Sequence, residues 1–535
     1  MIFAPPPPPT PLATLQAAPT FVDASLYFQE ELLDARFIDL DGDGRLELVV
    51  SVLDRARKER ELRIHRFDAE GRVTPTAERV YAVLDDVVAW TAADVRPDPG
   101  RELCLITPGG AFSLSPTQSG LRENIERLVR ADLFYTVPSA RELPWWPYAL
   151  EGEDAARLLL PTADTLVIWA RAPKDASEMD GGAPRDPREP SYVLETALVA
   201  SGAAEAAPSG DPSDRVSVGK GGVRMSFEAS YGRGFLLAER DVLGDELFDV
   251  GASLAAPALA DVNGDGRLDL LVPRGQSLDI HVARGDGGGY PAQPSRSETM
   301  PSSLWGGLES GDWRLADVDG DGDADLVVLK QEEGGDPLEN HEWRVMLFVN
   351  DGGRLMSEQP SALLRFHGSQ VSVRLADLDG DGRLDLFVRE VVLPSGLAMA
   401  TGFRFSLTTL LFRGEPGGFE RRPVLKQTRE YDEASLTSAI AQRVLRLDLS
   451  GDGIADLVEI DLRGRIAIRR VLREKRMFGG TSWTLEEEPW KRFDVRGRIL
   501  GLRVEDVNDD GLGDVISVSP DRLVLLVSRT SGGRR

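Results

Sequence analysis

The chain has 535 residues, of which 41% are apolar and 7% aromatic, which is an ordinary composition for a globular protein but too long for one conventional core. Acidic residues outnumber basic ones by 26, and this negative charge disfavours DNA, RNA and anionic lipid as partners. No stretch approaches the run of about 20 apolar residues that crosses a bilayer, so we expect no membrane insertion.

The N-terminal segment, residues 1–20, contains five consecutive prolines and is predicted to be a stiff, extended leader or linker. It shows no basic region and no long apolar stretch, so no signal peptide is visible. Residues 21–530 alternate short apolar, strand-like segments with turns rich in Gly and Asp. Residues 531–535 are expected to form a flexible tail.

One nonapeptide, Asp-Leu-Asp-Gly-Asp-Gly-Arg-Leu-Glu at residues 39–47, recurs along this central region. Each copy lies between two strand-like segments, which predicts a loop inside a β-hairpin. Decayed copies occupy residues 94–102 and 149–157. The near-identical copies begin at Asp261, Asp317, Asp377, Asp448 and Asp506.

Successive copies start 55, 55, 112, 56, 60, 71 and 58 residues apart, a period that suits a four-stranded blade. The eight copies predict an all-β fold, a β-propeller of eight blades, with seven as the alternative. We expect the ring to close by pairing of N- and C-terminal strands, with residues 21–28 as the outer strand of the last blade. The long gap predicts a disordered or loop insertion at about 172–222, and the strand-like segments at 223–228 and 235–239 are expected to complete the third blade.

The pattern of the six regular loops indicates calcium. Positions 1, 3 and 5 carry oxygen ligands, position 7 offers its backbone carbonyl, position 9 can close the shell with a carboxylate, and Gly at position 6 permits the turn. Six or seven oxygens suit Ca²⁺ better than Mg²⁺. The EF-hand fits poorly because its closing Glu falls at position 12 between helices, and for a single loop the alternative is a solvated acidic turn. The predicted ligands of about six Ca²⁺ sites are Asp39, Asp41, Asp43, Arg45, Glu47; Asp261, Asn263, Asp265, Arg267, Asp269; Asp317, Asp319, Asp321, Asp323, Asp325; Asp377, Asp379, Asp381, Arg383, Asp385; Asp448, Ser450, Asp452, Ile454, Asp456; Asp506, Asn508, Asp510, Leu512 and Asp514.

The charge at position 3 predicts an order of affinity among these loops. Asn263, Ser450 and Asn508 keep an oxygen there but lower the charge, so the loops that begin at Asp39, Asp317 and Asp377 are expected to bind most tightly.

The decayed loops are predicted to hold no metal. Arg96 and Arg157 occupy ligand positions, where a guanidinium group could replace the cation. Their expected partners are Asp94 or Asp98 and Glu151 or Glu153.

By these residues the chain resembles the FG-GAP/VCBS repeat family, bacterial relatives of the integrin α-subunit propeller, over roughly residues 21–530. Residues 251–269 match that family's repeat core best, whereas its Phe-Gly and Gly-Ala-Pro signatures are mostly absent. The resemblance implies Ca²⁺-ligand roles in the six regular loops and a function as an adhesion, lectin-like or scaffold module. Integrin-like propellers have seven blades, one fewer than the repeats counted here.

The resulting functional hypothesis is a calcium-binding propeller that serves as a protein-interaction, adhesion or scaffold module, with structural calcium and no catalytic residues. Weak sites of this kind need millimolar calcium, which favours a location outside the cytoplasm: periplasmic, secreted or on the cell surface. Four scattered histidines and the absence of a nucleophile motif argue against an enzyme. The alternatives are a carbohydrate-binding lectin, in which Trp145 or Trp146 would be exposed, and, less favoured, a polysaccharide-active glycosidase or lyase. Cys104, the one cysteine, is expected to be a buried, inert thiol.

Overall fold

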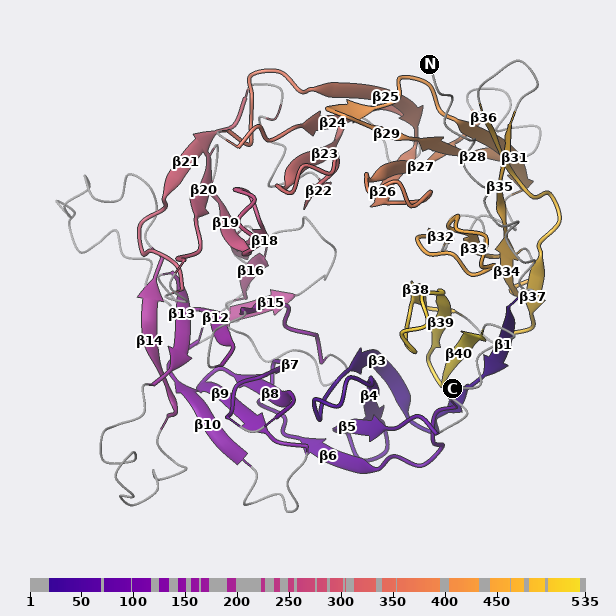
Figure 1. Cartoon of the computed structure of the whole chain (residues 1–535). Coiled ribbons are helices and arrows are strands. Elements are labelled where there is room, and N and C mark those ends of the chain that lie inside the picture. Colours follow the sequence, from indigo (N-terminus) through magenta and orange to yellow (C-terminus); the bar gives the residue numbers. More distant parts are fainter. Residues whose placement is uncertain are drawn as a thin grey trace, which may run out of the picture.

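The computed structural model forms a ring of eight blades, each a four-stranded antiparallel sheet, and is therefore an eight-bladed β-propeller (Figure 1). The all-β fold is confirmed, and the count of eight replaces the alternative of seven. The structure describes residues 19–529, apart from 69–71, 98, 117–124, 134–142, 151–154, 163–164, 173–189, 199–222, 227–234, 241–248, 255–256, 275–276, 286–288, 302–303, 305–311, 333–338, 353, 395–403, 433–442, 462, 476–480 and 496–498. None of the described residues lies in a helix long and apolar enough to cross a membrane.

In each blade the first strand lies nearest the centre of the ring and the fourth lies outside (Figure 1). Blade 1 contains β3 (Glu31–Ile38), β4 (Glu47–Asp54), β5 (Glu59–His65) and β6 (Arg79–Val83). Blade 2 contains β7 (Ala89–Ala93), β8 (Glu102–Thr107), β9 (Gly110–Leu114) and β10 (Ile125–Arg130). Blade 3 contains β11 (Ala149–Leu150), β12 (Arg157–Pro161), β13 (Leu166–Arg171) and β14 (Tyr192–Ala197).

The next three blades keep the same order, and blade 6 adds a small hairpin. Blade 4 contains β18 (Ala258–Ala260), β19 (Asp269–Arg274), β20 (Ser277–His281) and β21 (Arg296–Thr299). Blade 5 contains β22 (Asp312–Ala316), β23 (Asp325–Gln331), β24 (His341–Phe348) and β25 (Ala362–Gly368). Blade 6 contains β26 (Gln370–Ala376), β27 (Asp385–Val392), β28 (Arg404–Phe412) and β31 (Leu425–Asp432), with the hairpin β29 (Gly414–Glu415) and β30 (Gly418–Phe419).

The last two blades complete the ring, and blade 7 also carries an additional hairpin. Blade 7 contains β32 (Arg443–Leu445), β33 (Leu457–Ile460), β34 (Ile466–Arg469) and β37 (Lys491–Phe493), with the hairpin β35 (Val471–Lys475) and β36 (Thr481–Leu485). Blade 8 contains β38 (Gly501–Glu505), β39 (Asp514–Ser519), β40 (Arg522–Arg529) and β1 (Thr20–Asp23), with β2 (Leu26–Tyr27) also on β40.

The ring closes through its terminal strands, as predicted. β1 pairs antiparallel with β40, from Thr20 opposite Arg529 to Asp23 opposite Leu526, and supplies the outer strand of blade 8. A second closing contact comes from Arg503 on β38, whose guanidinium group donates a hydrogen bond to the carbonyl of Ala35 in blade 1 at 2.5 Å. The two ends of the chain are therefore held together by main-chain and side-chain bonds.

The third blade differs from the expectation. Its fourth strand is β14, which lies inside the segment 172–222 that was predicted to be an insertion. The strands β15 (Val223–Ser226), β16 (Phe235–Arg240) and β17 (Asp249–Leu254) instead form a separate three-stranded sheet. The edge of β13 already pairs with β14, so these strands have no free edge of blade 3 to extend. Most of the predicted insertion, the predicted leader and the C-terminal tail lie outside the described residues.

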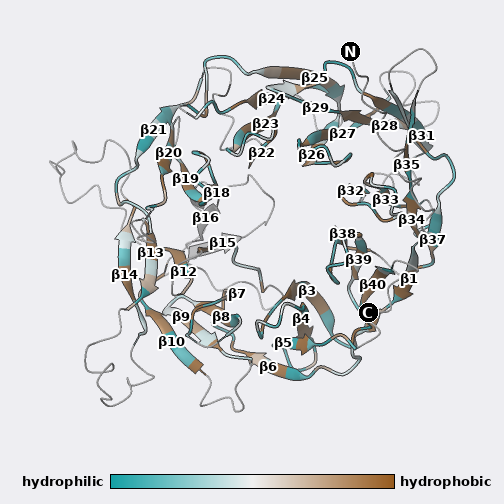
Figure 2. Ribbon diagram, in the orientation of Figure 1, coloured by the Kyte–Doolittle hydropathy of each residue, from teal (hydrophilic) through white to brown (hydrophobic). Residues whose placement is uncertain are grey.

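The core of the protein lies between adjacent blades. Val458 and Ile466 of blade 7, for example, pack with Val515 and Val524 of blade 8. Because both faces of a middle blade strand are covered by neighbouring sheets, such strands are apolar throughout, whereas outer strands are polar. Figure 2 shows this contrast between β40, which is hydrophobic, and β21, which is hydrophilic.

Candidate metal centre

Each regular acidic loop connects the first and second strands of its blade, as the sequence predicts. The loop bends because residues at positions 4 and 6 adopt left-handed backbone angles. In the Asp317 loop these are Gly320 (φ 80°) and Gly322 (φ 101°). In the last loop, position 4 is Asp509 (φ 55°), one of two non-glycine residues with positive φ among those described. Glycine avoids the steric cost of this conformation, which explains why position 6 is Gly in all six regular loops and position 4 is Gly in five of them.

The carboxylates at positions 1 and 5 of each loop accept hydrogen bonds from the loop's own backbone. Asp317 accepts hydrogen bonds from the N–H groups of Gly320 at 2.7 Å and Gly322 at 3.1 Å, and Asp321 accepts one from Asp323 at position 7, also at 3.1 Å. The contact between positions 1 and 6 recurs in all six regular loops, and so does the contact between positions 5 and 7. Position 7 (Arg45, Arg267, Asp323, Arg383, Ile454 and Leu512) therefore orients a carboxylate through its N–H group, a role that the sequence analysis missed.

The ninth residue has a structural role that the sequence analysis also missed. Asp325 is fully buried, and its two oxygens accept hydrogen bonds from the N–H groups of Val318 at 2.9 Å and Asn350 at 2.8 Å. It thereby ties the start of its loop to the residues that follow β24. The same pair of bonds is made by Asp269, Asp385 and Asp514.

The buried carboxylate at position 9 braces the blade by accepting backbone hydrogen bonds. This brace does not depend on the other acidic residues of the loop. In the decayed loop at 94–102, buried Glu102 accepts hydrogen bonds from the N–H groups of Val95 and Arg96. In the regular loops Glu47 and Asp456 accept from Leu40 and Leu449 at the second position. A carboxylate at this position is thus useful to the blade with or without a metal.

Successive loops are also linked to one another. The N–H group at position 8 of one loop donates to a carbonyl at position 1 or 2 of the preceding loop, as from Ala324 to Asp261 at 2.7 Å and from Leu384 to Val318 at 3.0 Å. The decayed loops take part through Arg101 and Ala156. Among the described residues, six of the eight pairs of adjacent loops are joined by such a bond; the junctions from the last loop to the first and from the 149–157 loop to the 261–269 loop show none.

In three loops the carboxylates converge closely enough to share one cation. Ligand oxygens of three residues lie within 4.8 Å of one another in the loops that begin at Asp39, Asp317 and Asp377, the three predicted to bind most tightly. The three residues are Asp39, Asp41 and Asp43 in the first, Asp317, Asp319 and Asp325 in the second, and Asp377, Asp379 and Asp385 in the third. In the loops with Asn263, Ser450 and Asn508, all within the described residues, no three carboxylates come this close together.

The Asp317 loop has the least compensated charge. Oδ1 of Asp319 and Oδ1 of Asp323 are buried without a hydrogen-bond partner. Burial, and then the charge of Asp321, raise the pKa of Asp323, and burial raises the pKa of Asp325 to about 6. No lysine or arginine among the described residues pairs with these carboxylates. Converging carboxylate oxygens that no protein donor or cation compensates suit a hard divalent cation, so the donor set fits calcium.

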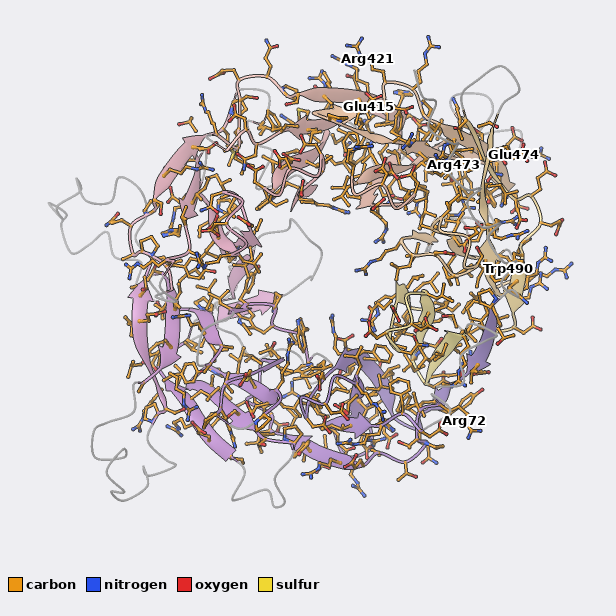
Figure 3. The ribbon with its side chains drawn as sticks, in the orientation of Figure 1. Arg72, Glu415, Arg421, Arg473, Glu474 and Trp490 are labelled. Atoms are coloured by element: carbon orange, nitrogen blue, oxygen red, sulfur yellow. The ribbon has the colours of Figure 1, made fainter. Side chains whose placement is uncertain are left out.

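The Asp377 loop contains a cation supplied by the protein. A guanidinium nitrogen of Arg413, just after β28, lies 3.0 Å from Asp379 Oδ2 and 2.8 Å from Asp381 Oδ2. Arg383 pairs with Asp381 at 2.6 Å, and Arg473 reaches to 3.5 Å from Asp379. Arg473 lies on the inner side of β35, with Glu474 on the outer side (Figure 3). Part of the negative charge is therefore neutralised without a metal.

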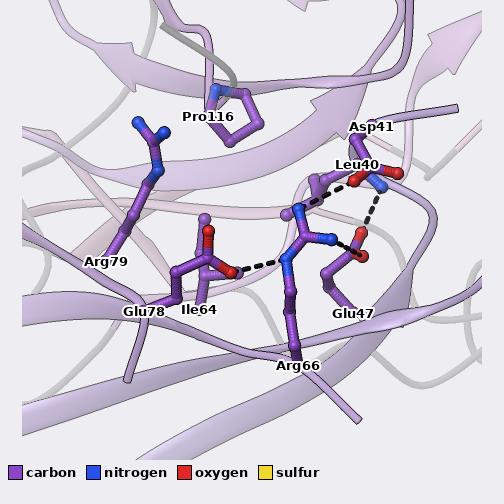
Figure 4. A pocket seen from close by; sticks show the side chains of 8 residues that line it. All are labelled: Leu40, Asp41, Glu47, Ile64, Arg66, Glu78, Arg79 and Pro116. Atoms are coloured by element: carbon purple, nitrogen blue, oxygen red, sulfur yellow. Dashed lines mark hydrogen bonds and ion pairs between the residues drawn. The ribbon is translucent and has the colours of Figure 1, made fainter. Parts of the chain in front are cut away.

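In the Asp39 loop, the neutralisation of carboxylate charge by protein cations is intermediate between that in the Asp317 and Asp377 loops. Arg66, which follows β5, lies 2.7 Å from Asp41 Oδ2, 3.8 Å from Glu47 Oε1 and 2.5 Å from Glu78 (Figure 4). A small pocket beside it is lined by Leu40, Asp41, Glu47, Ile64, Arg66, Glu78, Arg79 and Pro116.

The arginines of the decayed loops also pair with carboxylates. Arg96 donates to Ser113 at 2.9 Å and lies 3.4 Å from Glu126, and Arg157 pairs with Glu195 at 2.9 Å. These partners come from neighbouring strands and were not predicted. Among the expected partners, Asp98, Glu151 and Glu153 lie outside the described residues.

The aromatic pair Trp145 and Trp146 is largely packed inside. Trp146 is 1% exposed and donates a hydrogen bond to the carbonyl of Leu159, and Trp145 is half-buried, with its ring 4.9 Å from that of Trp90 and 5.2 Å from the guanidinium carbon of Arg36. Cys104 is fully buried, and burial raises the pKa of its thiol. Trp145 and Trp146 therefore do not form an open aromatic platform.

Fold and loops together define a class: a β-propeller whose blades carry repeated acidic hairpin loops. Residues 261–328 and 317–388 match the FG-GAP-like repeat family. Each match begins at one acidic loop, includes the next acidic loop and ends in the strand that follows it. Residues 261–388 of this eight-bladed propeller thus match FG-GAP-like repeats, as the sequence motifs predicted.

Other comparisons add little to this assignment. No curated protein matches the chain. A solved structure of a lectin from Agrocybe aegerita, described as specifically recognising non-reducing terminal N-acetylglucosamine, is similar at 13% identity and a TM-score of 0.34, over 82% of this chain and 87% of that one.

Proposed function

We propose that this protein is a calcium-stabilised interaction module without catalytic activity. The observation that carries the proposal is the Asp317 loop, where three carboxylates converge within 4.8 Å and two buried oxygens have no donor. Asp317, Asp319 and Asp325 would hold the ion, and the calcium would supply the missing positive charge.

Calcium in this setting acts as a structural fastener. Carboxylates 4 to 5 Å apart repel each other by roughly 3 to 4 kcal/mol per pair at an effective dielectric near 20, and the loop backbone carries that strain. Because the Asp317 loop is hydrogen-bonded to the Asp261 and Asp377 loops, ordering it also supports the adjoining blades. At a free calcium concentration 100 times the dissociation constant, a site adds about 2.7 kcal/mol of stability.

The interaction role rests on the architecture. A ring of blades presents broad faces and eight outer edges, on a chain with a net charge of −26 that disfavours nucleic acid. We propose a protein partner, and a location outside the cytoplasm, where calcium is abundant enough to fill weak sites. Carbohydrate binding is the alternative, but the packing of Trp146 removes half of the aromatic pair on which it depended.

Thermal unfolding with and without EGTA, combined with elemental analysis of bound calcium, tests the proposal. We expect a large fall in melting temperature on chelation and up to six calcium ions per chain, with the Asp317 site retained at the lowest calcium concentration. An unchanged melting temperature and no bound calcium would mean that the loops are solvated acidic turns.

A further inference from the structure

The interface between blades 6 and 7 contains a layer of arginines. The side of blade 6 that faces blade 7 is identified by Phe387 on β27, which packs in one cluster with Leu445 and Leu457 of blade 7. Residues two apart on a strand point to the same side, so Arg389 faces blade 7 as well. The layer comprises Arg389, Arg429, Arg443 and Arg469, with Glu459 as the carboxylate among them.

Three of the four arginines share that carboxylate. Glu459 is 3% exposed, and its oxygens lie 2.8 Å from Arg443, 2.6 Å from Arg469 and 3.4 Å from Arg429. Arg443 is also buried and donates hydrogen bonds to Tyr431 at 2.9 Å and to Thr409 at 3.2 Å. One negative charge thus serves three guanidinium groups.

Arg389 has no such partner. No described residue forms a hydrogen bond or ion pair with it, and its cross-strand neighbour Thr409 is already bonded to Arg443. Burial, followed by the charges of Arg443 and Arg374, lowers the pKa of Arg389 to about 10. Because arginine still stays protonated near neutral pH, a poorly hydrated positive charge is held beside two others. The layer therefore carries an excess of positive charge.

We propose that Arg389, together with Arg374, binds an oxyanion group: a carboxylate, sulfate or phosphate. The planar fork of a guanidinium group matches two oxygens of such a group. Arg374 is exposed on β26, the strand of blade 6 nearest the centre of the ring, so a ligand can approach from that side (Figure 1). This positively charged site shares no residue with the acidic loops and would exist whether or not they bind calcium.

Calorimetric titration of the full chain with sodium sulfate, at constant ionic strength in chloride, tests this site. We expect the wild type to bind one sulfate and the Arg389→Gln variant to bind it at least tenfold more weakly. The matched control is Arg365→Gln, which removes the same charge from the outer strand β25, where Arg365 pairs with Glu342. This control should keep the wild-type affinity within twofold.

Stability in chloride alone provides a second readout. Removing an uncompensated guanidinium group should leave the melting temperature of Arg389→Gln equal to or above that of the wild type, whereas loss of a structural ion pair would lower it. Titrations with phosphate and acetate then separate the tetrahedral anions from a carboxylate, and selective loss of any of these ligands in Arg389→Gln supports the site. Absence of binding by all three anions, or equal weakening in the two variants, would overturn it.

Discussion

The Asp317 and Asp377 loops share one motif and one backbone geometry but differ in their surroundings. In both, the first carboxylate accepts bonds from positions 4 and 6, and a fully buried ninth carboxylate braces the blade. In the Asp377 loop Arg413 lies within 3.0 Å of two carboxylates, whereas no described cation pairs with those of the Asp317 loop. The same nine positions thus make one site that lacks positive charge and one that already has some.

This difference shows that a ligand motif determines where the oxygens lie, and that neighbouring strands determine how much charge an ion has to supply. Calcium binding at the Asp317 loop relieves carboxylate repulsion. Binding at the Asp377 loop must also displace or tolerate a guanidinium group. We therefore expect the two loops to fill in that order.

The largest effect is expected from Asp325→Ala. This change removes a ligand and also leaves the buried N–H groups of Val318 and Asn350 without acceptors, which costs about 2 to 4 kcal/mol. Denaturant unfolding in EGTA measures this loss separately from calcium. Asp514→Ala is the matched control, because Asp514 braces Val507 and Ser528 in the same way within a loop that has Asn at position 3. Both variants should lose similar stability in EGTA, but only Asp325→Ala should lose the tightest calcium ion. Full stability of either variant in EGTA would contradict the brace.

A smaller effect is expected from pH in the absence of metal. The folded-state pKa values of Asp325 and Asp385 are raised to about 6 from a usual value of 3.8. The folded protein therefore binds protons more tightly than the unfolded chain, so this contribution to stability is complete below about pH 4 and is lost as the pH rises through about 6. Melting temperatures in EGTA should be higher at pH 5 than at pH 8, and Asp325→Asn should show a smaller difference. With calcium the trend should weaken or reverse, since protons compete with the ion. A metal-free protein that is more stable at pH 8 would be inconsistent with carboxylates buried in this way.

The smallest effect is expected from Arg413→Gln. Removing this guanidinium group leaves Asp379 and Asp381 less compensated, so calcium affinity at the Asp377 loop should rise roughly tenfold, or about 1.4 kcal/mol. Competition with a fluorescent calcium chelator measures this change. Arg421→Gln is a suitable control because Arg421 is exposed on the outer side of blade 6 (Figure 3). An affinity that rises equally in both variants would reflect overall charge and not the contact with Asp379.

The fold could be predicted largely from the sequence because the same nonapeptide motif recurs once in every blade. The repeated nonapeptide marks the first hairpin of each blade, and the ending of the last repeat after two strands predicted that residues near Phe21 would close the ring. The third blade was predicted less well. Its outer strand, Tyr192–Ala197, follows a stretch rich in Pro, Gly and Asp, which obscured a strand that only pairing with β13 identifies.

The candidate site could be predicted only in its local part. Spacing alone indicated which side chains point into each loop, since those contacts lie within nine residues. The partners Arg66, Arg413 and Asn350 follow the third strand of their blades, so no local pattern reveals them. Nor does the motif distinguish a ninth carboxylate that binds metal from one that braces the backbone, because both require a buried acid.

Calcium titration by calorimetry of the wild type, Asp319→Asn and Asp379→Asn tests the central claim most directly. Each variant changes one carboxylate at position 3, and Asp319 Oδ1 has no protein partner to lose. We expect the wild type to show one tightest site that disappears in Asp319→Asn and persists in Asp379→Asn. Equal losses in the two variants, or no calcium binding by the wild type, would contradict the account.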